Sequence, residues 1–367
     1  MCKKIIVCAL GLILAFSVSA QERKKFIDGQ MTDRFREHTG TVLDSRFLEQ
    51  DMYEVALDRE LAASYDTVCT YRVSHNQVTD QMKSGRCWLF STFNILRDEM
   101  IKKHDMGHFE FSQTYGMFWD ILEKSNRFLE NVIDNRKKPI DSRMNAWLFM
   151  KPIGDGGHFA NAAHIIDKYG VVPQEVMPER HSSLDNKWLM NLVRTSLRRY
   201  GLKLREADAK DIQSVKEKAL ADIYSILAHN LGLPPTEFEW TLKDKDGKVI
   251  STRSYTPYSF RDEFIWHDLE KDYVIFMNDS TKPYYRMYRV ENSRNCYEYA
   301  DWTFMNVPMD DILAMGVESL KNNTMFYFSA DTDASMLMMG GIYDVGLYDL
   351  GKDFGVSLDM TKEEKIR

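Results

Sequence analysis

The sequence lacks the features that mark several large classes of protein. It has no excess of basic residues, because 48 lysines and arginines stand against 55 aspartates and glutamates, for a net charge of −7. That balance argues against a general nucleic-acid-binding protein. It also has no low-complexity tract, and 44% apolar and 12% aromatic residues are enough to build a sizeable core. Disordered and collagen-like structures are therefore excluded, and 367 residues suffice for one large domain or two ordinary ones.

Long hydrophobic runs are also missing, except for one at the very start. Ile5 to Val18 is apolar, follows the basic pair Lys3-Lys4 and ends in the small-x-small sequence 18–20. This order is typical of a cleaved secretory signal, and the run is too short for a comfortable membrane span. We expect residues 1–20 to be removed and the product to be secreted or periplasmic, with no stable membrane anchor. An uncleaved signal anchor is the alternative.

Cysteine is scarce as well. Cys2 and Cys8 lie in the expected signal, so Cys69, Cys87 and Cys296 remain. Three cysteines are too few for a disulfide scaffold, and no cysteine or histidine spacing suggests a zinc site. We therefore expect neither a metal nor another cofactor. At most one disulfide can form, so at least one thiol of an exported protein needs another explanation.

Residues 21–80 are polar and mixed, apolar residues recur at helical spacing from about residue 88 to residue 232, and alternation replaces that pattern afterwards. We therefore predict an α+β fold with a boundary near residues 200–235. The predicted helices cover 88–104, 111–133, 161–169 with a C-cap at Gly170, the stretch 185–232, a helix capped by Thr256-Pro257, and 310–321. The predicted strands are a hairpin of 238–242 with 248–252, two strands at 273–277 and 284–290, and a buried strand at 325–328.

Cys87 lies where a glycine-containing loop enters the first long predicted helix. A helix N-terminus offers unpaired N–H donors and a partial positive charge, which favour the nucleophilic thiolate. Gln81, six residues upstream, carries an amide that can donate to an oxyanion, and the Cys87 N–H supplies a second donor. A lone cysteine is most often only a small buried hydrophobic residue, so the interpretation depends on the joint pattern.

That joint pattern resembles the active-site segment of papain-like cysteine peptidases. The form Ser-Gly-Arg-Cys-Trp-Leu-Phe, residues 84–90, is similar to the bleomycin hydrolase and aminopeptidase C branch. The resemblance implies that Cys87 attacks peptide bonds and forms a thioacyl intermediate, with Gln81 in the oxyanion hole. It also implies a cysteine-type aminopeptidase that acts on peptides and forms a homohexamer.

The resemblance continues over about residues 40–358. Asp155-Gly156-Gly157 is similar to the glycine pair that lines the non-prime side of the papain cleft, where a peptide backbone can approach because no Cβ intervenes. His158 follows directly, and we expect it in the wall of the substrate-binding site, with a catalytic role as a minor alternative. A plain turn is the other interpretation of the two glycines.

The same resemblance divides the chain by role. It implies an N-terminal arm at 21–80, a helical lobe with the nucleophile at 81–200, an inserted α/β region at 201–320, and the start of a β-rich lobe at 321–367.

The histidine base and the asparagine that orients it in such peptidases have no counterpart. No histidine follows His267, and Asn292-Ser293 is followed by Arg294 instead of tryptophan. Thiol catalysis needs a base that accepts the proton and returns it to the leaving amine. We therefore expect a chain truncated before these two residues and inactive alone. A peptide-binding pseudoenzyme and a non-functional fragment are the alternatives.

Overall fold

The computed structural model describes residues 44–66, 68–73, 77–330, 336–337, 342–344, 346–358, 360–361 and 364–365. The predicted signal segment, residues 1–20, lies outside these ranges. The chain forms two compact units, which are described in turn. The larger comprises residues 69–329, and the smaller combines 1–68 with 330–367. The division by role expected from the sequence is a different one and stays a prediction.

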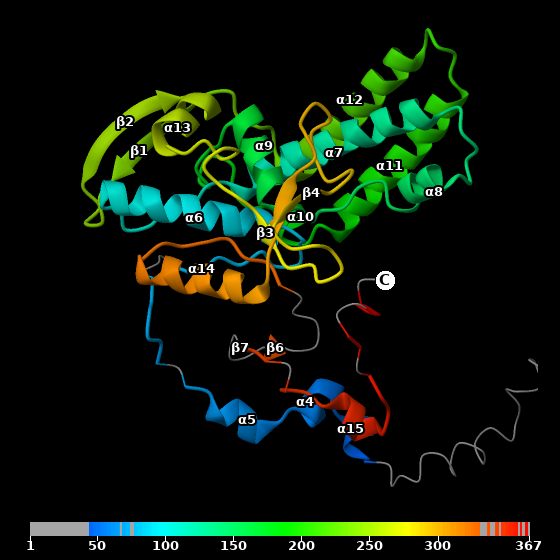
Figure 1. Ribbon diagram of the computed structural model, residues 1–367. Helices are drawn as coiled ribbons and strands as arrows, with labels where there is room; N and C mark the ends of the chain where they lie inside the picture. Colours follow the sequence, from blue (N-terminus) through cyan, green and yellow to red (C-terminus); the bar gives the residue numbers. More distant parts are fainter. Residues whose placement is uncertain are drawn as a thin grey trace, which may run out of the picture. The chain divides into compact units, whose positions relative to one another are not determined.

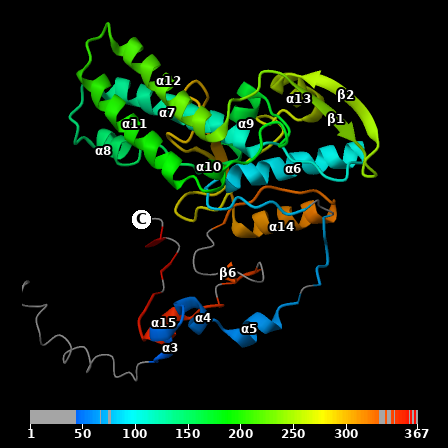
Figure 2. The same cartoon turned by 180° about the vertical axis from the view of Figure 1, so that it is seen from behind.

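Helices dominate the larger unit (Figure 1). Their bounds are α6 (Cys87–His104), α7 (Gln113–Asn135), α8 (Arg143–Met150), α9 (Phe159–Tyr169), α10 (His181–Leu184), α11 (Lys187–Glu206), α12 (Ile212–Leu231), α13 (Pro257–Phe264) and α14 (Met309–Lys321). Figures 1 and 2 show α7, α11 and α12 running side by side. Their facing sides form one apolar core around Phe128, Leu197 and Leu227, which makes this end of the unit a helical bundle.

A second core forms where α6 and α9 meet the hairpin of β1 (Phe238–Lys243) and β2 (Val249–Tyr255). Trp88, Phe111 and Phe260 are almost fully buried in it. The N-terminal end of α6 is thereby packed into the core through Trp88, although Cys87 next to it is exposed. The rigid core thus presents the thiol at a fixed place on the surface.

The remaining strands of the larger unit form a small mixed sheet in the order β3-β5-β4. Here β3 (Phe276–Met277) runs parallel to β5 (Thr303–Asn306), and β4 (Arg286–Arg289) runs antiparallel to it. The Asn306 side chain holds the end of β5 by donating to the backbone carbonyls of Asp279 and Lys282, at 2.9 and 3.0 Å.

The smaller unit joins the two ends of the chain. Its elements are α3 (Arg46–Glu49), α4 (Met52–Ala56), α5 (Arg59–Ser64), β6 (Met336–Leu337), β7 (Ile342–Tyr343) and α15 (Leu350–Phe354). Asp58 N donates to the Leu347 carbonyl at 2.9 Å, and the rings of Phe47 and Phe354 lie 4.8 Å apart. These contacts connect residues 289 and 307 positions apart in the sequence.

The long helices, the hairpin and the two predicted helix ends are confirmed. Thr256 caps α13 with Pro257 in its first turn, and Gly170 ends α9 with a φ of 71°. The buried strand at 325–328 was wrong, because this segment pairs with no strand among the described residues and Phe328 is 72% exposed. The strands predicted at 273–277 and 284–290 shorten to β3 and β4, since their pairing with β5 is brief. The short helices α8 and α10 were not predicted.

Candidate active site

Cys87 is the first residue of the 18-residue helix α6, with Arg86 in the N-cap position. The sequence placed Cys87 at a helix start, and the structure does the same. The Arg86 carbonyl accepts from the N–H groups of Leu89 and Phe90, at 2.9 and 3.0 Å, so regular helix geometry begins at once. The earliest N–H groups of a helix have no partner inside it, and Cys87 provides one of them. An exposed thiol beside such donors is suited to nucleophilic attack on a carbonyl.

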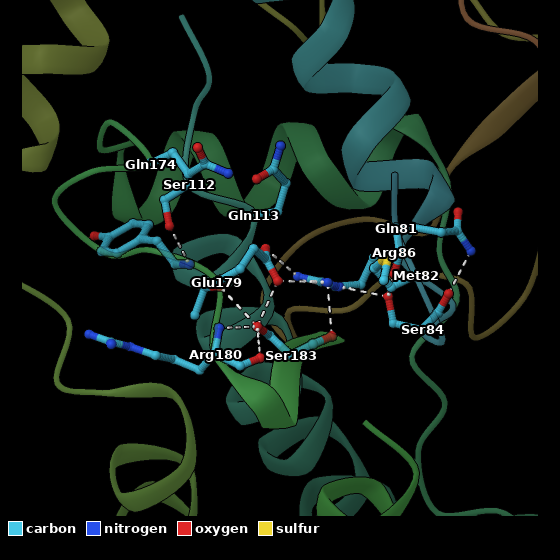
Figure 3. A network of polar contacts seen from close by, with 12 residues as sticks. Gln81, Met82, Ser84, Arg86, Ser112, Gln113, Gln174, Glu179, Arg180 and Ser183 are labelled. Carbon is cyan, nitrogen blue, oxygen red and sulfur yellow. Dashed lines mark hydrogen bonds and ion pairs between the residues drawn. The ribbon is translucent and has the colours of Figure 1, made fainter. Parts of the chain in front are cut away.

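Arg86 anchors the junction between the loop and α6, and its side chain is only 1% exposed. Its guanidinium forms a two-point ion pair with Glu179, at 2.8 and 3.0 Å, and also donates to the Ser183 carbonyl and the Ser84 hydroxyl, both at 2.9 Å (Figure 3). Ser183 Oγ donates to the same carboxylate at 2.6 Å. A buried charge is tolerated when it is paired with an opposite charge and hydrogen-bonded in this way.

Gln81 lies in the same loop and folds back onto it. Its Nε2 donates to the Ser84 carbonyl at 2.5 Å, and Ser84 Oγ donates to the Gln81 carbonyl at 2.7 Å (Figure 3). Met82 between them has a φ of 52°, so the backbone turns sharply. One amide hydrogen of Gln81 is thus used to hold the loop, which leaves its second hydrogen for another acceptor.

The segment Asp155-Gly156-Gly157 packs against the start of α6. Trp88 Nε1 donates to the Asp155 carbonyl at 3.0 Å, and a Cβ at Gly157 would lie 2.8 Å from the Trp88 indole. A Cβ at Gly156 would meet no heavy atom within 4 Å, so this glycine borders open space. On the other side, Lys124 Nζ donates to the Gly156 carbonyl at 2.7 Å. The structure therefore brings the predicted glycine pair together with the loop of the predicted nucleophile.

His158 caps the start of α9 through its backbone. Its N–H donates to Asn161 Oδ1 at 3.0 Å, and its ring lies 4.8 Å from that of Trp302. His158 is exposed, but partial desolvation of its ring lowers its pKa, and the positive charge of Lys124 lowers it further. Both effects favour the neutral imidazole.

Tyr327 was missed by the sequence reasoning. Burial raises its pKa to about 12, and an electrostatic interaction with Cys87 adds to this rise. Its ring is 6.1 Å from that of Phe159, the first residue of α9. No local signal pointed to Tyr327, because 240 positions separate it from Cys87.

A base for the Cys87 thiol is not found among the described histidines, none of which hydrogen-bonds to Cys87. His164 binds Asn295 Oδ1 at 3.1 Å, His267 lies 3.0 Å from Glu99, and the His104 ring packs on Phe264. The described residues also hold no cluster of three metal-ligating side chains and no helix apolar and long enough to cross a membrane.

Comparison with known proteins identifies the family. The profile of the Peptidase C1-like family matches residues 22–367. Aminopeptidase C of Listeria monocytogenes is 34% identical over 83% of this chain and 69% of its own length. Bleomycin hydrolase of Mus musculus is 31% identical over 86% of this chain and 72% of its own. The crystal structure of PepW from Lactobacillus rhamnosis matches with a TM-score of 0.85 and 31% identity, over 92% of this chain and 78% of that one. The chain therefore belongs to the peptidase C1-like family and has the papain-like α+β fold that its sequence predicted.

Proposed function

We propose that this protein is a cysteine-type aminopeptidase in which Cys87 is the nucleophile. The observation that carries the proposal is the exposed Cys87 at the start of α6. Its neighbour Trp88 hydrogen-bonds to the Asp155 carbonyl and packs against Gly157, which places the glycine pair beside the helix start. The names of the relatives, aminopeptidase C and bleomycin hydrolase, support the choice of peptide substrates with a free amino terminus.

The proposed reaction has two steps. The Cys87 thiolate attacks the carbonyl carbon of the peptide bond, and the oxyanion accepts hydrogen bonds from the Cys87 N–H and the free hydrogen of the Gln81 amide. The C–N bond then breaks, and the amine leaves with the proton that the thiol gave up. Water hydrolyses the thioester on Cys87, which restores the thiol and releases the acid. Gly156 leaves room for the substrate backbone, and His158 forms part of the surrounding wall.

Both steps need a group that moves the proton, and none of the described histidines hydrogen-bonds to Cys87. The chain holds no histidine after His267. We therefore expect acylation by reactive substrates but negligible turnover of amides by this chain alone. The same observation favours a second candidate function, a peptide-binding protein without catalysis, which differs in that Cys87 would not become acylated.

Two further parts of the proposal concern export and assembly. The N-terminal sequence pattern of residues 1–20 supports export to the periplasm or the medium. Resemblance to the bleomycin hydrolase branch supports a homohexamer, and analytical ultracentrifugation tests this directly.

Acylation by an activated substrate separates the candidates. The full chain is mixed at neutral pH with the p-nitrophenyl ester of leucine, and the adduct is mapped by mass spectrometry. We expect the leucyl group on Cys87 and loss of the adduct in Cys87→Ala. Cys69→Ala is the matched control, because Cys69 is also exposed, and this variant should keep the adduct. Equal acylation of Cys69 and Cys87 contradicts the proposed site, and an unmodified Cys87 with measurable peptide binding favours the binding protein.

A further inference from the structure

Asp155 joins three segments that are distant in the sequence. Its Oδ2 accepts from the Gly85 N–H at 2.7 Å and from Asn186 Nδ2 at 2.8 Å. Its backbone carbonyl accepts from Trp88 Nε1 at 3.0 Å. One residue therefore holds the loop before Cys87, the first turn of α6 and the segment before α11.

The packing around Asp155 leaves no room for an added side-chain atom at Gly85 or Gly157. A Cβ at Gly85 would lie 2.8 Å from the Asp155 carboxyl group, and a Cβ at Gly157 would lie 2.8 Å from the Trp88 indole. Such distances are shorter than real Cβ contacts, so a side chain at either glycine would force Asp155 or Trp88 to shift. The loop before Cys87 and the glycine pair thus contact each other twice, once through the carboxylate and once through the indole.

The hydrogen bonds at Asp155 are made to a charged group. Partial burial acts to raise the pKa of Asp155, but the donors from Asn186 and Gly85 outweigh it, and the pKa lies below its ordinary value. The group is therefore ionised at neutral pH, and hydrogen bonds to a carboxylate are stronger than those to a neutral acceptor.

The third segment is fixed to the same loop by its backbone. Lys83 N donates to the Leu184 carbonyl at 2.9 Å, and Lys83 pairs with Asp185 in a parallel bridge. Asn186, the next residue, is 5% exposed and reaches Asp155 with its side chain. The carboxylate consequently closes a ring of contacts from 83–85 through 184–186 back to 155–157.

We propose that Asp155 is a positioning residue that keeps the Gln81–Cys87 loop at a fixed distance from Gly156-Gly157. The inference rests on the proposed function, in which the loop carries the nucleophile and the glycine pair borders the bound peptide. Without the carboxylate, Cys87 keeps its place at the start of α6, but the distance between the loop and the glycine pair is no longer fixed. Misplacement of about 1 Å is enough to slow an aligned reaction by a large factor.

The first test does not depend on any activity. Hydrogen–deuterium exchange is measured on the peptides that contain residues 82–88, in the full chain and in Asp155→Ala and Asp155→Asn. We expect exchange in this loop to accelerate by about tenfold in Asp155→Ala, less in Asp155→Asn, and not at all in Asp141→Ala, a control at an exposed turn. Unchanged exchange in both Asp155 variants overturns the inference.

The second test measures alignment with a substrate. The label on Cys87 is followed for leucine chloromethyl ketone and for chloroacetamide, and the ratio of the two rates is compared among the variants at a temperature well below unfolding. We expect the ratio to fall roughly tenfold in Asp155→Ala, with the chloroacetamide rate nearly constant. A purely structural role would leave the ratio unchanged, and that result also overturns the inference. A ratio near one in the unmodified chain contradicts the proposed function instead, and the exchange experiment then decides on Asp155.

Discussion

A methyl group at Gly157 would enter space that the Trp88 indole already fills. The added Cβ would lie 2.8 Å from two indole carbons, and Trp88 is only 1% exposed and bonded to the Asp155 carbonyl. The ring cannot turn away without losing that bond and its packing. Overpacking of this kind costs about 1–3 kcal/mol, and loss of the hydrogen bond adds roughly 1 kcal/mol. We therefore expect Gly157→Ala to lower the free energy of unfolding by about 2–4 kcal/mol.

Gly156→Ala is the matched control. A Cβ there meets nothing within 4 Å, and neither glycine has a left-handed φ, so alanine is compatible with the backbone at both positions. Replacing such a glycine stabilises a protein by about 0.4–1 kcal/mol through the unfolded state. The free energy of unfolding of Gly156→Ala should therefore equal or exceed that of the unmodified chain.

The assay is equilibrium urea unfolding followed by far-ultraviolet circular dichroism, combined with labelling of Cys87 by leucine chloromethyl ketone. Gly157→Ala should unfold at lower urea. Gly156→Ala should unfold at the same or higher urea but react more slowly with the ketone, because its methyl group lies where the peptide backbone approaches. Equal stability of the two variants would refute the packing, and an undiminished labelling rate in Gly156→Ala would refute the placement of the substrate.

Three other predictions concern the same region. Glu179→Gln leaves the buried guanidinium of Arg86 without its counter-charge and should lower the free energy of unfolding by about 3 kcal/mol in the same urea assay; a loss below 0.5 kcal/mol contradicts the ion pair. Iodoacetamide should modify Cys87 in minutes but Cys296 only after unfolding, because Cys296 is fully buried and its burial raises the pKa of the thiol; mass mapping checks this. The stabilising contribution of Asp155 is present above the pKa of an unfolded aspartate and is lost as pH falls through its lowered folded pKa, so the stability difference from Asp155→Asn should shrink below about pH 4.

Much of the fold could be predicted because local patterns determine it. The helical spacing of Leu89, Phe93, Leu96 and Met100 in α6 is encoded within a few residues, and so are the turn of the hairpin and the cap at Thr256. The segment 325–328 could not be predicted in this way. An apolar, aromatic run is equally compatible with a buried strand and with an irregular segment, and only pairing with a distant strand decides between them.

The residues of the candidate site also fall into two groups, those that local sequence reveals and those that depend on distant contacts. Cys87 and Gln81 lie in one short segment whose spacing is specific, and the glycine pair is visible as Gly156-Gly157. The role of Asp155 depends on a contact across 70 positions, and the electrostatic interaction of Tyr327 with Cys87 spans 240 positions. The hydrogen bond of Gln81 to the Ser84 carbonyl was also not predictable, because side-chain orientation inside a loop has no sequence signature.

A crystal structure of the chain after reaction with leucine chloromethyl ketone tests the central claim most directly. The account predicts a thioether on Cys87 Sγ, with the ketone oxygen within hydrogen-bond distance of the Cys87 N–H and Gln81 Nε2, and with the leucyl backbone next to Gly156. An adduct on another residue, or a ketone oxygen that faces away from Gln81 while the leucyl group avoids the glycine pair, would contradict it.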